Sequence, residues 1–487
     1  MQKARTVVGY LPDERPPFWK LLFYAIQQVI VMFPATVAVA LITGFQVSTT
    51  IFASGLATLC FILITGRQIP LYYGSSFSYL TAITGLMTSE AIKTMVSPGT
   101  LEKLEAWKQG TTSILPAEAI SYAQFGIIMS GLISIAAGFL VRAFGSAAVE
   151  KILPPSITGP VAMIIGLTLA GTALSDAAPK PVAEGAAATV MNSNWVWVVS
   201  LVTLLSTILF SRYLKGFLGQ LPLLLGAAVG CITAGIIYAV GGADFNLFRE
   251  IPKEALEASL WHAGPIAVPA FTLPKPSLAA MVAIMPIAIA TIPESTAHMY
   301  QLDVYVNDLA KKKGSSKKYN LAEKLDINLI GDGIGDMISG LVGGPAGTNY
   351  GENISTMAIT KVFSVSVLAL AAVIAMVISF FTPLVQGIYS IPLAVIGGLE
   401  VYLFGAIAAQ GAAIMIEKKV DMFSPKNIAV IATIMVIGLG GNYAFGGNIP
   451  FFGIEVPCIA GAAIFGILLN LILSIGEKKQ AKDAEEE

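Results

Sequence analysis

Long apolar segments constrain this sequence more than any other feature. A helix needs about 20 mostly apolar residues to cross a bilayer, and the chain contains fourteen apolar runs, two of them clearly shorter than this. The runs are continuous, which favours helices over the alternating pattern of a β-barrel. They cover residues 18–43, 46–65, 75–88, 120–141, 152–174, 194–211, 221–241, 277–300, 322–342, 350–362, 363–385, 391–412, 427–446 and 455–475. The sequence therefore predicts an all-α polytopic membrane protein with fourteen transmembrane segments.

The composition excludes several other classes of protein. Only 12% of the 487 residues are charged and 55% are hydrophobic, whereas a soluble domain carries about 25% charged residues. A formal net charge of −1 lacks the basic excess of a nucleic-acid-binding protein. Two histidines and three widely separated cysteines give no spacing typical of a metal site. No nucleic-acid partner and no metal are therefore expected.

The distribution of basic residues predicts the orientation in the membrane. When fourteen segments are threaded from a cytoplasmic N-terminus, most of the 29 Lys and Arg residues fall on the cytoplasmic side. This asymmetry is what the positive-inside rule requires, and an odd number of spans would destroy it. We expect a multi-pass protein of the cell's inner (cytoplasmic) membrane, with residues 1–17 and 476–487 as cytoplasmic tails.

The third and tenth segments are short and are interrupted by Gly and Pro. Residues 69–77 read IPLYYGSSF before the third apolar run, and residues 343–353 read GGPAGTNYGEN before the tenth. The two lie seven segments apart, and such matched interruptions are typical of inverted-repeat transporters with a site at the bilayer midplane. We predict a 7+7 inverted repeat in which a short extended stretch precedes a half-helix in segments 3 and 10. The alternative is that both are merely kinked helices or packing elements.

Few ionisable residues lie at membrane depth, where such residues are candidates for function. Glu294 and His298 share one face of the eighth segment because they are four residues apart. Glu352 opens the half-helix of the tenth segment, where the helix dipole favours a carboxylate. The remaining candidates lie in the ninth and twelfth segments: Asp332, Asp336 and Glu400. For each residue the alternative is a hydrogen-bonded tie between helices, and for Glu400 that alternative is favoured.

The most specific motif is residues 350–361, which read YGENISTMAITK. The motif fits a family signature of Glu or Gln, Asn, any residue, Gly, four residues, Thr, then Arg, Lys or Gly. Ser355 departs from it, because glycine is usual there. Weaker matches lie at 74–77 and 391–398. With these motifs the chain resembles the nucleobase–ascorbate transporters, and within them the bacterial uracil/xanthine permeases, from residue 14 to the final segment.

The resemblance implies a division into two domains and a mechanism. Segments 1–4 and 8–11 would form a core domain, and segments 5–7 and 12–14 a gate domain. The core domain would comprise residues 18–141 and 277–385, and the gate domain residues 152–241 and 391–475. Members of the family commonly form homodimers through the gate domain. They import a nucleobase by alternating access of core against gate, usually with proton symport, so the expected coupling ion is a proton and no other cofactor is expected.

The resemblance also implies roles for individual residues. Glu294 and Glu352 would contact the base, and Phe77 and Gly351 would offer backbone N–H groups from the two half-helices. Tyr350 would flank the base, and His298 with Glu294 would couple the proton. Secondary candidates are Asp332, Ser355 and Glu400. Three departures from the family pattern are Gln28 in place of a first-segment histidine, Ser355 in place of glycine, and Glu400 in place of a small or apolar residue.

The resemblance favours uracil as the expected substrate, because family members that prefer xanthine often carry Gln at the position of Glu352. A xanthine or purine permease of the same family is the first alternative. An anion transporter of the same fold is the second, although two glutamates suit an anion poorly. A membrane-embedded enzyme or a channel lacks any supporting motif, so the chain is expected to be a transporter and not an enzyme.

Overall fold

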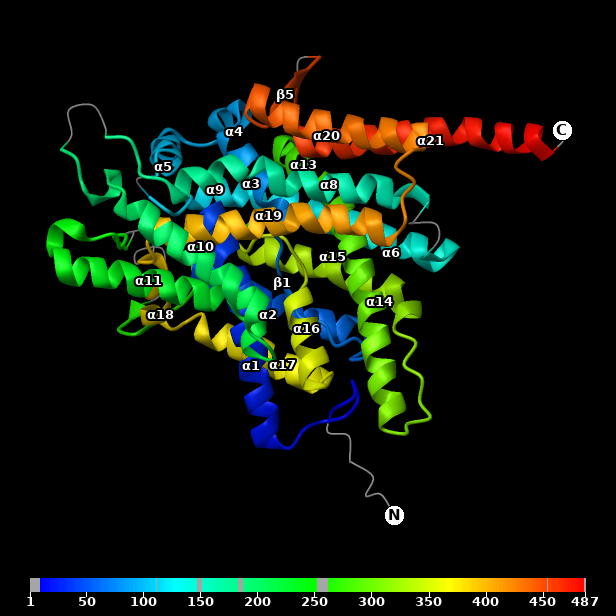
Figure 1. The fold of residues 1–487 in the computed structure, drawn as a ribbon, viewed down its shortest axis with the longest axis horizontal. Coiled ribbons are helices and arrows are strands. Elements are labelled where there is room, and N and C mark those ends of the chain that lie inside the picture. Colours follow the sequence, from blue (N-terminus) through cyan, green and yellow to red (C-terminus); the bar gives the residue numbers. More distant parts are fainter. Residues whose placement is uncertain are drawn as a thin grey trace.

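The computed structural model describes residues 9–110, 112–146, 151–182, 187–251, 262–452 and 454–485, which are mostly helical (Figure 1). The helices of the first half are α1 (Phe18–Thr43), α2 (Val47–Ile64), α3 (Leu80–Thr88), α4 (Glu90–Met95), α5 (Pro98–Lys108), α6 (Ala117–Phe144), α8 (Pro155–Thr168), α9 (Ala170–Ala177), α10 (Trp195–Tyr213) and α11 (Pro222–Gly241). Those of the second half are α13 (Leu278–Ile284), α14 (Ala288–Lys312), α15 (Leu325–Val342), α16 (Gly351–Thr360), α17 (Val365–Ile378), α18 (Thr382–Tyr389), α19 (Leu393–Glu417), α20 (Pro425–Phe445) and α21 (Cys458–Glu485).

Each of the fourteen predicted segments coincides with one helix or one pair of consecutive helices. Ten helical stretches in the described part of the chain are long and apolar enough to cross a membrane. The helical fold class is confirmed, whereas the count of fourteen spans stays a prediction. Parts of the predicted tails, residues 1–8 and 486–487, lie outside the described residues.

The helix α14 extends well beyond its apolar run. The eighth run ends at residue 300, but α14 continues to Lys312. Polar residues interrupt the apolar residues of this extension, so it could not be recognised as part of a continuous apolar run. Leu302, Val306 and Leu309 are nevertheless fully buried along one face of the helix. The extension is therefore an amphipathic helix whose apolar stripe packs on the protein.

Among the residues that the structure describes, three two-stranded antiparallel sheets accompany the helices. The pairs are β1 (Tyr73–Ser75) with β4 (Gly347–Asn349), β2 (His262–Ala263) with β3 (Ile266–Ala267), and β5 (Asn448–Phe451) with β6 (Ile454–Pro457). The last two are hairpins between neighbouring segments and are too short to be recognised from apolar runs. The first joins strands that are more than 270 residues apart, and it lies near the middle of the molecule (Figure 1).

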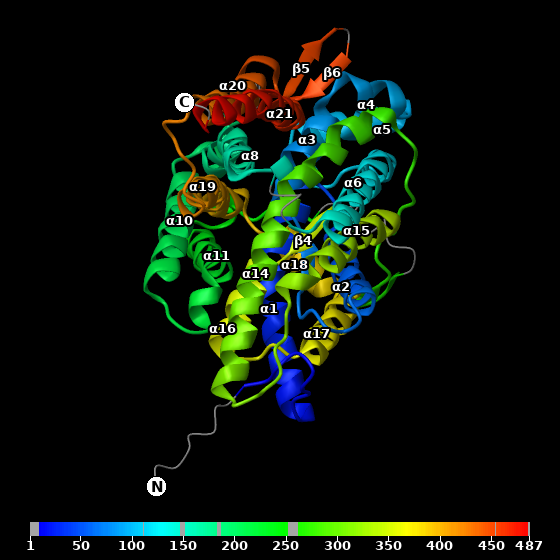
Figure 2. The ribbon, with the colours of Figure 1, turned by 90° about the vertical axis from the view of Figure 1, so that its right-hand side faces the viewer.

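The long helices pack in two sets. In one, α15 packs against α6 and α2, and α17 packs against α1 and α2. In the other, α19 packs against α8, α9 and α10, while α20 packs against α8 and α21. Figure 2 shows α8, α10, α11 and α19 together on one side and α20 with α21 at one end. These sets follow the predicted core and gate, but α14 and α8 also touch across them, so the division stays a prediction.

Glycine makes the crossing of β1 and β4 possible. A Cβ atom at Gly74 would overlap the ring of Tyr350, and one at Gly347 would overlap the ring of Tyr73 and the carbonyl oxygen of Gly74. Close approach of two backbones is one of the uses of glycine within a strand. The two strands can pair at this depth only because neither position has a side chain.

We expect Gly74→Ala to lower the free energy of unfolding by about 1–3 kcal/mol or more, because the added methyl group overpacks the crossing. Gly85→Ala in α3 is the matched control, since a Cβ there meets no atom within 4 Å and alanine favours a helix. The midpoint of thermal unfolding in detergent measures both. Equal midpoints for the two variants would contradict the close-packing account.

Candidate functional site

The crossing of β1 and β4 brings the starts of two helices close together. Tyr73 pairs with Asn349 and Ser75 with Gly347. Two further backbone hydrogen bonds, each 2.9 Å long, extend the pairing. The N–H of Tyr350 donates to the carbonyl oxygen of Tyr72, and the N–H of Ser76 donates to the carbonyl oxygen of Ala346. Beyond the crossing, β1 leads through the short 3₁₀ helix η1 (Phe77–Tyr79) into α3, and β4 leads into α16. This is the predicted pair of extended stretches and half-helices, each of which begins with N–H groups that lack an intrahelical partner.

Asp336 on α15 anchors both strands of the crossing. Its Oδ1 accepts the hydroxyl of Tyr73 in β1 and, at 2.8 Å, the backbone N–H of Gly347 in β4. Its Oδ2 lies 3.5 Å from the hydroxyl oxygens of Tyr79 and Ser130. Donors from four elements therefore converge on one buried carboxylate. For Asp336 the structure favours the tie between helices that the sequence left open.

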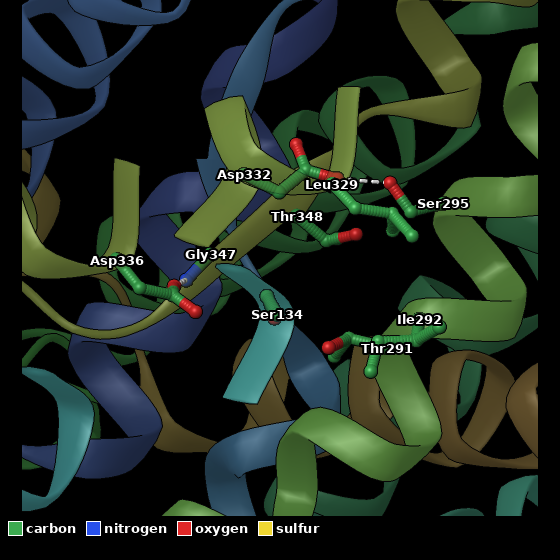
Figure 3. Close-up of a pocket in the computed structure, with 9 residues that line it drawn as sticks. All are labelled: Ser134, Thr291, Ile292, Ser295, Leu329, Asp332, Asp336, Gly347 and Thr348. Carbon is green, nitrogen blue, oxygen red and sulfur yellow. Dashed lines mark hydrogen bonds between the residues drawn. The ribbon is translucent and has the colours of Figure 1, made fainter. Parts of the chain in front are cut away.

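Asp332, one turn earlier on α15, holds a second polar network (Figure 3). Its Oδ2 accepts the hydroxyl of Ser295 on α14 and, at 3.1 Å, the side-chain amide of Asn349 at the end of β4. Asn349 also donates to the hydroxyl of Ser295 at 2.9 Å and to the side-chain oxygen of Asn328 at 3.2 Å. The network joins α14, α15 and β4, and within the described residues the Oδ1 of Asp332 has no hydrogen-bond partner.

A small polar cavity lies between these networks (Figure 3). Its volume of about 10 Å³ gives room for a single water molecule. The buried hydroxyl of Thr348, which has no hydrogen-bond partner in the described part of the chain, points into the cavity. The lining residues are Ser134, Thr291, Ile292, Ser295, Leu329, Asp332, Asp336, Gly347 and Thr348. The cavity belongs to the shell that holds the crossing, and it is too small for an organic ligand with a ring.

The two predicted glutamates come together at the start of α16. Glu294 on α14 is half-buried and lies close enough to Glu352 for their charges to interact. Glu352, at the start of α16, is exposed, although protein surrounds it closely. His298 is buried one turn after Glu294, and its Nε2 faces Gly351, where a Cβ would lie 3.0 Å away. The structure therefore places Glu294, His298, Gly351 and Glu352 in one cluster.

Tyr350 directly precedes Gly351 at the start of α16, and Phe77 lies at the start of the other half-helix. The Tyr350 hydroxyl lies 3.0 Å from the carbonyl oxygen of Ser75 and 3.0 Å from the hydroxyl oxygen of Thr36. Tyr350 is thus a buried brace between β1, α1 and α16, which leaves only its ring to flank a ligand. Phe77 is half-buried at the start of η1. Ser355 is half-buried on α16, and its side-chain hydroxyl makes no hydrogen bond among the described residues.

Glu400 lies in a different cluster. It is 2% exposed within α19, and its Oε2 has no hydrogen-bond partner among the residues that the structure describes. Its charged neighbours are Asp176, Lys180 and Arg249. The side chain of Arg249 donates to the backbone oxygen of Ile391 at 2.8 Å, where α19 is about to begin. In the described part of the chain no contact joins Glu400 to Glu294 or Glu352. The structure therefore separates Glu400 from the other candidates.

Sequence reasoning missed the uncharged members of the site. Ser295, Asn328 and Asn349 are all buried and hold Asp332. Asn353 is also buried, and its amide donates to the side-chain oxygen of Gln28 at 2.7 Å, which ties α16 to α1. The available signal was the four-residue repeat of polar residues on α15: Asn328, Asp332 and Asp336. A repeat of this kind places polar side chains on one helix face.

Comparisons with known proteins bear on the same chain. A model described as Permease family matches residues 19–447. The chain is 32% identical over 493 residues to the uracil permease of Bacillus subtilis (strain 168), covering 100% of this chain and 99% of the relative. It is 35% identical over 478 residues to the uracil permease of Bacillus caldolyticus, covering 98% and 96%. Both relatives are named as permeases and not as enzymes, as the sequence predicts.

A search of solved structures finds the same fold at low identity. The murine Solute Carrier 26 family member A9 anion transporter, in the inward-facing state, is similar with a TM-score of 0.61. The match covers 96% of this chain and 69% of that one at 12% identity. This likeness supports the membrane fold of the chain and carries nothing about its substrate.

Replacement of Tyr73 by Phe tests the anchor at Asp336. A hydrogen bond to a charged group contributes about 1.5–3 kcal/mol, so Tyr73→Phe is expected to lower the unfolding free energy by that amount. Tyr24→Phe is the control, because Tyr24 is a half-buried tyrosine of α1 that makes ring contacts with Tyr10 and Phe23. Its effect should stay within about 0.5 kcal/mol. If both variants unfold at the same temperature as wild type, the hydrogen bond between Tyr73 and Asp336 contributes little to stability.

Proposed function

Because this chain belongs to the Permease family, the family to which its motifs point, we propose that it is a multi-pass membrane transporter that imports a nucleobase, with uracil as its preferred substrate. The observation that carries the proposal is the cluster at the start of α16. There two carboxylates, Glu294 and Glu352, meet beside a half-helix whose first N–H groups are free of helical partners. The two curated relatives reported above are named uracil permeases, which supports the choice of base.

Uracil is matched to this set of groups. Its rim carries two N–H donors and two carbonyl acceptors, and the ring is uncharged near neutral pH. Carboxylates accept N–H donors through charge-assisted hydrogen bonds, and backbone N–H groups at helix starts donate to carbonyl oxygens. Glu352 and Glu294 would receive the donors of the base, while Gly351 and Phe77 would supply donors to its carbonyls. A site of this kind rejects analogues that leave a carboxylate unpaired.

The position of Phe77 supports alternating access of core against gate. Phe77 packs against an apolar cluster that includes Val39 of α1, Leu80 of α3, and Leu403 and Phe404 of α19. This apolar cluster therefore spans the predicted core and gate, and it packs against the start of the first half-helix. Since the polar cavity behind β4 cannot hold a ring, a base would bind on the exposed side of Glu352. Separation of the two sets of helices along this apolar contact would give a base access to Glu352.

Burial of Glu294 and His298 supports proton coupling. Closing the site over a bound base would remove Glu294 and Glu352 from water, and a neutral carboxyl group is cheaper to bury than a charged one. A proton taken up with the base would lower the cost of closing, so a proton gradient would drive import. Import would take place across the inner membrane with both termini in the cytoplasm, and the gate helices would form the homodimer contact.

The binding proposal is tested by replacing each glutamate with glutamine. We expect Glu294→Gln and Glu352→Gln to weaken uracil binding by about ten- to hundredfold, because each loses a charge-assisted hydrogen bond. Glu102→Gln, at an exposed residue of α5, serves as control and should bind as wild type. Calorimetric titration of purified protein with uracil, and separately with xanthine, gives the affinities. Wild-type protein that binds xanthine and not uracil would establish the alternative substrate.

The coupling proposal is tested in sealed proteoliposomes. A difference of one pH unit, acidic outside, should drive about tenfold accumulation of radiolabelled uracil for one proton carried per base. A protonophore should reduce the internal concentration to the external one. Accumulation that persists after the proton gradient has collapsed would rule out proton symport.

A further inference from the structure

Residues 9–15, which precede the first helix, form a strap across the end of the molecule opposite β5 and β6. Near its start, the strap runs beside the junction of α16 and α17. The N–H of Tyr10 donates to the carbonyl oxygen of Lys361 at 2.8 Å, and the N–H of Phe363 donates to that of Tyr10 at 2.7 Å. Further on, the N–H of Val365 donates to the carbonyl oxygen of Pro12 at 3.1 Å. The strap thus pairs, in the manner of a short β-strand, with the residues that connect α16 to α17.

The same residues hold the loop that follows α14. The ammonium group of Lys313 donates to both carboxylate oxygens of Glu14, at 2.6 and 2.8 Å, and to the carbonyl oxygen of Gly9 at 3.0 Å. Asp13 accepts the ammonium group of Lys317 at 2.6 Å and the hydroxyl of Tyr319 at 2.5 Å. Two adjacent acidic residues of the strap are therefore bound to three residues of one loop.

That loop is in turn fixed to α14 itself. The N–H of Tyr319 donates to the side-chain oxygen of Asn307 at 3.0 Å, and the N–H of Leu321 donates to the carboxylate of Asp303 at 2.6 Å. Leu11 of the strap is 3% exposed and belongs to the same apolar cluster as Leu309 of α14 and Phe363. Backbone hydrogen bonds, ion pairs and apolar packing therefore connect α14 to α16 through the strap.

Partial burial opposes ionisation of Asp13, but its hydrogen bonds from Lys317 and Tyr319 hold its pKa below the ordinary value. A lowered pKa means that the contribution of Asp13 is complete at neutral pH and is lost only as the pH falls through the acidic range. The link is thus formed under the conditions in which transport takes place.

We propose that Asp13 and Glu14 are positioning residues, because the strap fixes the end of α16 relative to α14 and so sets the placement of Glu352 beside Glu294. The inference rests on the proposed function of those glutamates. From Lys361 to Glu352 there are nine residues, or about 14 Å of helix, and α16 is a rigid ten-residue rod. A tilt at its strapped end would move the carboxylate at the other end.

The test compares the double variant Asp13→Asn/Glu14→Gln with wild type and with Glu417→Gln. Glu417 is exposed at the end of α19. Hydrogen exchange should become faster in the amides of residues 351–360 and stay unchanged in α19. Uracil affinity, measured at equal folded fraction, should fall about three- to tenfold, in line with the loss of two exposed ion pairs. Tyr319→Phe removes only one hydroxyl donor and should show the same pattern more weakly.

Three results would overturn the inference. Exchange in α16 equal to wild type would show that the strap does not hold this helix. Exchange that rises equally in α16 and α19 would show a general loss of stability. Faster exchange in α16 with unchanged uracil affinity would show that the strap does not position the site. If wild-type protein fails to bind uracil, the proposed function fails, and hydrogen exchange alone then decides whether the strap holds α16.

Discussion

A membrane interior offers no water to backbone groups, so every N–H and C=O group at that depth needs a partner within the protein. The two short strands near the middle of the molecule, β1 and β4, would violate that rule if either stood alone. Each satisfies the other, because Tyr73 to Ser75 pair with Gly347 to Asn349 across the molecule. The carboxylate of Asp336 then takes the N–H of Gly347 and fixes the pair to α15. The rest of the site depends on this pairing.

The pairing explains why the candidate ligand groups converge. Each strand of the crossing leads directly into a helix, β1 through η1 into α3 and β4 into α16, so both helices start beside the crossing. The helix start at Gly351 lies against His298 of α14, which brings Glu294 and Glu352 into one cluster. The other end of α16 is held by residues 9–15. A ten-residue helix fixed at both ends can hold a carboxylate in place, as a binding site requires.

The sequence was enough to predict the apolar segments, the two broken helices and the pair of glutamates. These features follow from local properties: hydropathy, Gly and Pro in matched positions, and charge at membrane depth. The partner of each strand could not be predicted, because it depends on contacts between residues more than 270 positions apart. The roles of Ser295, Asn328 and Asn349 were missed for a related reason. Small uncharged polar residues are common in membrane helices, and only their convergence on Asp332 distinguishes them. The sequence likewise gave no sign that Asp13 and Glu14 bind residues of a distant loop.

The central claim is that a base binds between the starts of the two broken helices, on the carboxylates of Glu294 and Glu352. An experimental structure of the protein with uracil tests it most directly. The account predicts ring nitrogens of uracil within hydrogen-bond distance of both carboxylates and a carbonyl oxygen facing the N–H of Gly351. Density for uracil elsewhere, or at this place with neither glutamate in contact, would contradict the account.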